Sequence, residues 1–165
     1  MTESSLLPET SNNRIARINL DEASLARGNA SIEHEREVAI FDILDGNSFE
    51  VVGHDSGPYI LDFAIADDRL VMKIETEGGE PVTTHQVAMS PLKRLLKDYF
   101  LVLDSYYQAI KSGQPSRIQA IDIGRRGLHD EGSRLLQERL DGKVTIDFDT
   151  ARRLFTLISA LHWKG

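Results

Sequence analysis

The strongest pattern in the chain is an alternation of apolar and polar positions from residue 59 to residue 76. A period of two is typical of a strand that buries one face. If the chain turns at Asp67-Asp68, three apolar residues of the first run face three of the second. A second turn at Gly78-Gly79 leads into a third strand, which completes an antiparallel meander over residues 59–89. The predicted pairs are Ile65 with Leu70, Phe63 with Met72 and Leu61 with Ile74, and the third strand is expected to add His85, Val87 and Met89 to the same side.

A long amphipathic helix is predicted after the meander, with Ser90 as N-cap and Pro91 at the first helical position. Its apolar positions follow a 4-3-4-3-4 spacing, which forms one stripe along the helix. Such a stripe suits an internal core and also the seam of a dimer. Gly113 and Pro115 are expected to end the helix after about 20 residues. The stripe consists of Leu92, Leu96, Tyr99, Leu103, Tyr106 and Ile110.

Two further helices are predicted from their caps and apolar spacing. Ser31 is expected to cap a helix that ends near Leu44, and Asp149 is expected to cap the final helix. The final helix should turn Leu154 and Phe155 towards the core. Short strands are predicted over residues 14–20, 49–52 and 144–148.

Residues 116–140 are also helical in pattern, with two glycines, Gly124 and Gly132, on the apolar face. An internal glycine costs about 1 kcal/mol of helix stability relative to alanine. The two glycines therefore indicate either the close approach of another element or a break in the helix near Gly127.

Together these elements predict one α+β domain over residues 14–165. Its antiparallel sheet is centred on residues 59–89 and covered by helices from residues 31–45 and 91–162. A length of 165 residues is sufficient for one domain with a sizeable core. Residues 1–13 show no periodicity and are predicted to be a disordered tail.

Composition excludes several classes of protein. Without cysteine the chain can form no disulfide and no cysteine-ligated metal site. No apolar run reaches the roughly 18–20 residues of a membrane span. The N-terminus lacks the basic and apolar regions of a signal peptide. We therefore expect a cytoplasmic protein that spans no membrane.

Charge is distributed unevenly along the chain. Residues 1–90 carry 6 Lys/Arg and 17 Asp/Glu, whereas residues 91–165 carry 13 and 9, so the net charges are −11 and +4. The two halves are expected either to attract each other within the fold or to present two faces to different partners. The overall net charge of −7 argues against general nucleic-acid binding.

Five segments of the chain resemble a bacterial family known as uncharacterised protein family 0262. They extend over almost everything after the first 13 residues, and the resemblance is specific. It implies no particular activity, substrate or site. The segments are Ile32-Glu33-His34-Glu35-Arg36, Gly57-Pro58-Tyr59, Lys97-Asp98-Tyr99-Phe100, Gly124-Arg125-Arg126-Gly127-Leu128-His129 and Thr150-Ala151-Arg152-Arg153-Leu154-Phe155-Thr156-Leu157.

The segment 122–133 is the densest in groups that could carry chemistry. In a helix, Asp122 pairs with Arg126 in the favourable acid-first order, and His129 lies one turn after Arg125. This histidine could act as a general base or a phosphoacceptor while both arginines hold an anionic group. The string also resembles the phosphoacceptor histidine box of sensor kinases, although no nucleotide-binding region accompanies it. The alternative is a boundary histidine within a salt-bridged helix.

A second candidate site lies at the start of the long helix. Free backbone N–H groups, a hydroxyl and three cations in the first two turns would suit a phosphate or a carboxylate. The alternative is that acidic residues of the first half, such as Glu75 or Glu80, neutralise these cations. The candidate residues are Ser90, Lys93, Arg94 and Lys97.

No metal or cofactor site is predicted. The acidic segment 33–37 lacks the spacing of a helical zinc site, because position 38 is Val where a second His would be needed. Residues 54–56 place His, Asp and Ser side by side, but no nucleophile elbow surrounds them. The chain also lacks a Walker A loop and a dinucleotide-binding glycine motif.

The absence of a catalytic constellation favours a non-catalytic, cytoplasmic regulatory or interaction module. Its partner would be another protein, a small anionic ligand or a second copy in a homodimer. The rival hypothesis is a small enzyme, or a phosphotransfer or anion-binding protein, that uses His129 with Arg125, Arg126 and a nearby acid such as Asp122.

Overall fold

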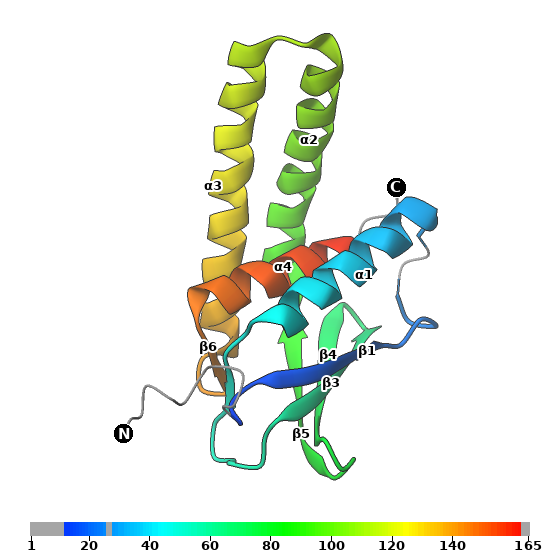
Figure 1. Ribbon diagram of the computed structural model, residues 1–165, viewed down its shortest axis with the longest axis vertical. Coiled ribbons are helices and arrows are strands. Elements are labelled where there is room, and N and C mark those ends of the chain that lie inside the picture. The colour runs from blue at the N-terminus through cyan, green and yellow to red at the C-terminus, as the bar shows by residue number, and fades with distance from the viewer. Residues whose placement is uncertain (1–11, 26–27, 163–165) are drawn as a thin grey trace.

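The computed structural model describes residues 12–25 and 28–162, so most of the predicted N-terminal tail lies outside the described residues. These ranges form an α+β domain, as the sequence predicts (Figure 1). In chain order the elements are β1 (Ile15–Leu20), α1 (Ala30–Asp45), β2 (Phe49–Val51), β3 (Tyr59–Ala66), β4 (Arg69–Thr76), β5 (Pro81–Ala88), α2 (Ser90–Ser112), α3 (Pro115–Leu140), β6 (Val144–Ile146) and α4 (Phe148–His162).

The main sheet has the strand order β1-β3-β4-β5. Its meander is confirmed in register: Ile65 lies opposite Leu70, and the two other predicted pairs follow. Both turn residues, Asp67 and Asp68, have positive φ, the backbone conformation of tight two-residue hairpins. His85 and Val87 lie opposite Met72 and Leu70, on the predicted side. β1 joins the sheet parallel to β3, and β2 pairs with β6 in a separate two-stranded ribbon.

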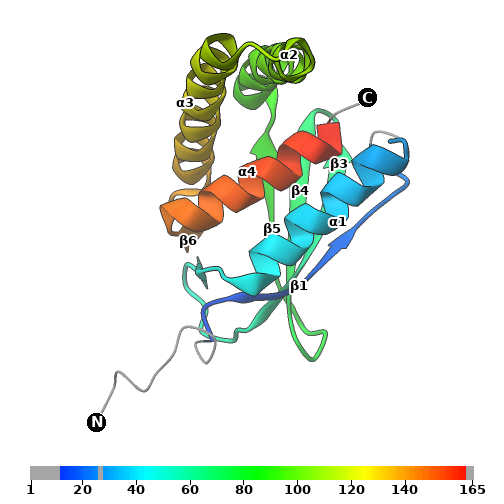
Figure 2. The ribbon, with the colours of Figure 1, turned by 45° about the horizontal axis from the view of Figure 1, so that its top comes forward.

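The helices form two groups. α1 and α4 run side by side across one face of the sheet (Figure 2). α2 and α3 form a hairpin that projects well beyond this body (Figure 1). Because the hairpin projects, the apolar stripe of α2 is buried at Leu92, Leu96 and Leu103 but 47% exposed at Ile110. The predicted core-facing stripe is therefore correct only where α2 meets the body.

All three predicted N-caps are wrong by one or two residues. The Asn29 side chain, not Ser31, accepts the Ile32 N–H at the start of α1. The side chain of Asp147, not Asp149, accepts the Thr150 N–H at the start of α4. At α2 the N-cap position belongs to Met89, whose side chain makes no capping hydrogen bond. Asn29 has the extended backbone typical of an N-cap, with φ −91° and ψ −175°, whereas Met89 lies in the right-handed helical region.

α3 is one continuous helix through Gly127, so no break occurs there. At Gly132 a Cβ atom would overlap the ring of Phe155 on α4, whereas at Gly124 and Gly127 it would meet nothing within 4 Å. The predicted close approach is therefore confirmed at Gly132 and absent at Gly124. The contact between Gly132 and Phe155 therefore sets how closely α3 and α4 approach each other where they cross.

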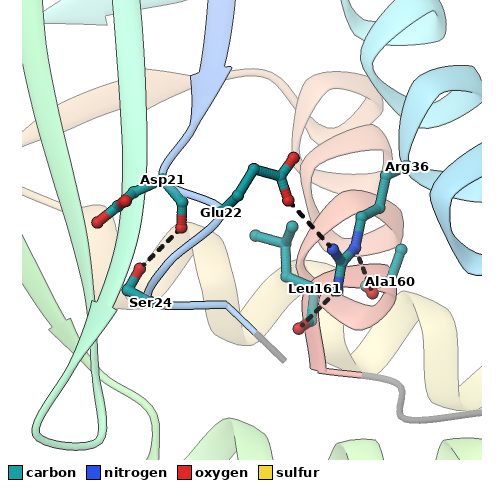
Figure 3. A network of polar contacts seen from close by, with 6 residues as sticks. All are labelled: Asp21, Glu22, Ser24, Arg36, Ala160 and Leu161. Atoms are coloured by element: carbon teal, nitrogen blue, oxygen red, sulfur yellow. Dashed lines mark hydrogen bonds and ion pairs between the residues drawn. The ribbon is translucent and has the colours of Figure 1, made fainter. Parts of the chain in front are cut away.

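The far end of α4 is fastened to α1 by a buried arginine (Figure 3). Arg36 is 2% exposed, and its guanidinium donates to the carbonyl of Ala160 at 3.1 Å and to that of Leu161 at 3.4 Å. Glu22 lies 3.9 Å away on the other side of the group. These carbonyls belong to the last turn of α4, where helix carbonyls lack partners within the helix. Arg36 thus caps α4 from another element.

Candidate functional site

A cavity of about 480 Å³ opens where α2, α3 and α4 meet. This volume is within the range of small-molecule sites, roughly 300–1,000 Å³. Four of its eight lining residues are arginines, which is an unusual concentration of one charge in a single cavity. The lining consists of Tyr99, Arg125, Arg126, His129, Asp149, Arg152, Arg153 and Thr156.

Helical spacing brings these residues together from three elements. On α3, Arg125 and His129 are four residues apart and therefore share a face. On α4 the polar positions 149, 152, 153 and 156 follow the i, i+3, i+4, i+7 pattern, again along one face. Tyr99 comes from the buried stripe of α2. The crossing at Gly132 and Phe155 turns the faces of α3 and α4 towards the same space.

One carboxylate holds the two arginines of α3 that line the cavity. Asp122 accepts from Arg125 at 2.7 and 2.9 Å and lies 2.9 Å from the guanidinium of Arg126. These contacts, the hydrogen bond from Arg125 first, lower the pKa of Asp122. Arg125 also lies over the ring of Tyr106, 5.4 Å from its centroid. The predicted pair of Asp122 with Arg126 is present, and Arg125 is added to it.

The arginines of α4 are less fully neutralised. Arg152 lies 3.6 Å from Asp130, a contact too long for a strong hydrogen bond. Arg153 donates to the backbone carbonyls of Asp42, at 2.9 Å, and of Gly46. Carbonyls position a guanidinium but carry no full negative charge. Even with Asp122 and Asp130 included beside Asp149, the four arginines leave an excess of positive charge around the cavity.

His129 is buried, with 7% of its surface exposed, and its ring lies against those of Tyr99 and Phe155. Its Nε2 is 2.8 Å from Oγ1 of Thr156, and that hydroxyl donates to the carbonyl of Arg152 at 3.1 Å. Because the hydroxyl proton is already used, Nε2–H is the donor and Nδ1 carries the lone pair. Nδ1 is buried and has no hydrogen-bond partner among the residues that the structure describes.

The surroundings of His129 keep it uncharged. Burial, together with the charge of Arg152, lowers the pKa of His129 to about 4. Burial likewise raises the pKa of Tyr99, which keeps the phenol neutral. At neutral pH the positive charge of the cavity therefore comes from arginine alone.

The second predicted site is only partly assembled. Lys93 and Lys97 line another cavity of about 390 Å³, with Phe100 and Leu161 among its apolar residues. Ser90 and Arg94 are exposed and do not line it. Lys93 is paired with Asp68 in the β3–β4 turn, and neither Glu75 nor Glu80 supplies its partner. The turn is held there because Met89 N–H donates to the Asp68 carbonyl.

The uneven charge of the chain has a structural counterpart. The pair of Lys93 with Asp68 joins the basic half to the acidic half. The ion pairs of Arg125, Arg126 and Arg152 instead lie within the basic half. The four arginines and three aspartates at this cavity leave one net positive charge there, which is part of the +4 carried by residues 91–165.

Sequence reasoning placed Arg125, Arg126 and His129 in one site but missed the contribution of α4. Arg152, Arg153 and Thr156 read as the solvent-facing side of an amphipathic helix. A signal was present, because these residues lie in a segment that carries the family resemblance. Three of the five such segments, 97–100, 124–129 and 150–157, line this cavity.

Within the described ranges, no three His, Asp or Glu side chains gather where they could hold a metal ion. None of the helices in those ranges combines the length and apolar content that a bilayer crossing requires.

The fold and the cavity define a small α+β protein with an arginine-rich recess between three helices. A family model described as "Uncharacterised protein family (UPF0262)" matches residues 12–164, and the chain belongs to this family. It is 57% identical over 158 residues to a UPF0262 protein of Rhodopseudomonas palustris, covering 96% of this chain and 97% of that protein. It is 55% identical over 157 residues to one of Nitrobacter winogradskyi, covering 95% and 94%. No solved structure matches the chain significantly.

Proposed function

We propose that the protein is a non-catalytic module that binds a small anion, carrying a phosphate or carboxylate group, in the cavity between α2, α3 and α4. The observation that carries the proposal is the convergence of Arg125, Arg126, Arg152 and Arg153 on one recess. Asp122, Asp130 and Asp149 offset three of these four charges, so one excess positive charge remains and repels its cationic neighbours. An anion in the recess would relieve that repulsion.

The chemistry of arginine supports an oxyanion as the ligand. A guanidinium is planar, stays charged at every physiological pH and presents paired N–H donors that match a phosphate or a carboxylate. The side chains of Arg126 and Arg152 are 68% and 47% exposed, so both retain donors that can turn towards a ligand. Arg153, which is held by carbonyls, adds charge from the second helix.

The contacts of His129 favour binding over general-base or phosphotransfer chemistry. A general base works best when its pKa lies near the working pH, and a pKa of about 4 is far below it. A phosphoacceptor needs a ring nitrogen that the incoming phosphoryl group can reach. Here Nε2 is bonded to Thr156 and Nδ1 is enclosed. In this proposal His129 positions Thr156 and forms an uncharged wall of the site.

Calorimetric titration of the purified protein with inorganic phosphate and with sulfate tests the proposal. We expect 1:1 binding that weakens roughly tenfold or more in Arg152→Met and again in Arg126→Met, because each loses charge-assisted hydrogen bonds. Arg139→Met is the matched control, since Arg139 is exposed on the last turn of α3 and does not line the cavity. It should bind like the wild type.

Two results would count against the site. If Arg139→Met weakens binding as much as Arg152→Met, the anion responds to general surface charge rather than to the cavity. If the wild-type protein binds neither anion, the protein-interaction module becomes the stronger hypothesis. Affinity capture with the intact chain as bait would then identify its partner.

The cytoplasmic location and the homodimer expected from the sequence remain predictions. Fractionation of cells, with immunodetection of the protein, tests the first. Sedimentation velocity tests the second. Substitution at Ile110, the exposed end of the α2 stripe, or at the neighbouring exposed Tyr107 should then shift the measured mass.

A further inference from the structure

A second, smaller cavity of about 200 Å³ adjoins the arginine-rich one. The two cavities share Tyr99, Arg125 and Thr156, so these three side chains form the boundary between them. The remainder of the second cavity comes from α1, α2 and the later turns of α4. Those residues are Ile32, Glu35, Leu103, Tyr107, Ser159 and Ala160.

The walls of the second cavity differ in kind from those of the first. Ile32, Leu103 and Ala160 are buried apolar residues, and Tyr107 adds an aromatic ring that is 47% exposed at the surface. Apart from the shared Arg125, no cation within residues 12–25 and 28–162 lines it. An apolar cavity of about 150 Å³ is large enough to hold one benzene ring. Beside the polar groups of Glu35, Ser159 and Thr156, these apolar walls leave room for a single flat ring rather than for an anionic group.

The charges fix the orientation of a ligand that fills both cavities. Glu35 lines the second cavity and would repel an anionic group there. The arginines of the first cavity attract that same group. Arg125, on the boundary, can contact the anion with its donors and a ring with the face of its guanidinium plane. The arrangement thus separates an anionic end from an apolar end.

We propose that the ligand is a ring-bearing phosphate monoester, with its phosphate among Arg126, Arg152 and Arg153 and its ring between Leu103, Tyr107 and Ala160. This inference rests on the proposed function, because it adds a ring subsite to the same anion site. The second cavity would then select among ligands, since the arginines alone would accept many oxyanions. Tyr99, Arg125 and Thr156 contact both parts of the ligand.

Competitive calorimetry with phenyl phosphate, methyl phosphate and inorganic phosphate tests the inference. Phenyl phosphate should bind roughly 10- to 100-fold more tightly than methyl phosphate, the gain expected from burying one aromatic ring. Methyl phosphate should bind about as tightly as inorganic phosphate. The three ligands share the same anionic group, so differences between them report on the second cavity.

The substitution Ala160→Leu places a larger side chain inside the second cavity only. It should remove the advantage of phenyl phosphate and leave the affinity for methyl phosphate unchanged. Ala120→Leu, at an exposed position of α3, is the matched control and should retain the full advantage. If Ala160→Leu loses its fold, Tyr107→Ala at the exposed wall supplies the same comparison, because it removes one side of the ring subsite.

The outcomes separate the two proposals. If methyl and phenyl phosphate bind with equal affinity, the ring subsite is refuted while the anion site stands. If the phenyl advantage survives both Ala160→Leu and Tyr107→Ala, the ring binds elsewhere and the assignment is wrong. If none of the three phosphates binds, the anion site itself is refuted and the ring subsite with it.

Discussion

The two ends of α4 use arginine in opposite ways. At the C-terminal end, Arg36 from α1 is buried and its donors are taken by the carbonyls of Ala160 and Leu161 (Figure 3). At the N-terminal end, Arg152 lies beside an open cavity with only a 3.6 Å contact to Asp130. The helix dipole favours a cation at the first of these ends and disfavours it towards the second. One arginine completes the fold, whereas the other leaves charge available for a ligand.

Both residues are arginines, so their burial and their partners, rather than the residue type, separate a structural role from a binding role. A buried guanidinium whose donors meet carbonyls contributes to stability, and its removal leaves those acceptors without partners. A guanidinium at a cavity, with spare donors and incomplete neutralisation, contributes little to stability and can contribute much to affinity.

The largest effect on stability is expected for Arg36→Ala, which should lower the free energy of unfolding by about 3 kcal/mol. The change removes the cap of α4 and leaves a void between α1 and α4. Urea unfolding followed by circular dichroism measures it. Arg152→Ala is the matched comparison and should cost no more than about 0.5 kcal/mol, because its side chain is 47% exposed and its ion pair is long. Equal losses in both variants would remove the contrast between the two ends.

Acid should destabilise the protein through His129. Its folded-state pKa of about 4 lies below the ordinary value of 6.5, so the unfolded chain takes up a proton first as the pH falls. Stability is complete above pH 6.5 and declines towards pH 4, by about 2 kcal/mol at pH 5 from this group. The pKa values of His85 and His162 are also lowered by burial and act in the same direction.

Comparing the wild type with His129→Gln isolates the contribution of this one histidine. The amide of the glutamine can still donate to Thr156 but does not titrate. The difference in unfolding free energy between the two proteins should therefore change by about 2 kcal/mol from pH 7 to pH 5. Parallel stability curves over this range would mean that His129 titrates normally in the folded protein, and the binding site would then contain a chargeable imidazole.

Alanine substitutions at two glycines of α3 should change the stability of the protein in opposite directions. Gly132→Ala should destabilise the protein by roughly 1–3 kcal/mol, because its methyl group overlaps the ring of Phe155. Gly127→Ala should stabilise it by up to about 1 kcal/mol, since the site is open and alanine is the better helix former. Thermal unfolding of both variants measures the pair. Stabilisation by both would mean that the two helices can move apart freely.

The register of the meander was predictable because period-two alternation leaves only one pairing that puts the alternating apolar residues of β3 and β4 on the same face. The N-cap residues could not be predicted, because polar residues cluster near the start of each helix. Asn29 and Ser31, or Asp147 and Asp149, are equally suitable as residue types. The choice between them depends on the backbone of the preceding loop, which local sequence does not determine.

Half of the candidate site was predictable, and the reason for the missing half is geometric. The α3 residues form one dense segment, so Arg125 and His129 could be placed together by helical spacing alone. Arg152 and Arg153 are 27 residues or more from Arg125 in sequence and join it only where the two helices cross. That crossing depends on Gly132 and Phe155, a contact that no local pattern encodes.

The smallest expected effect is the dependence of sulfate affinity on pH. Between pH 6 and pH 8.5 the affinity should change less than about twofold, because arginine stays protonated and sulfate does not titrate in that range. Asp122, with its lowered pKa, stays ionised, and Tyr99 and His129 stay neutral. Calorimetric titrations at fixed ionic strength measure it, since salt alone would weaken the attraction. A tenfold loss on raising the pH from 6 to 7.5 would show that His129 becomes charged when the anion binds. The cavity would then bind anions through a titratable group, and His129 rather than the arginines would distinguish it from the buried site of Arg36.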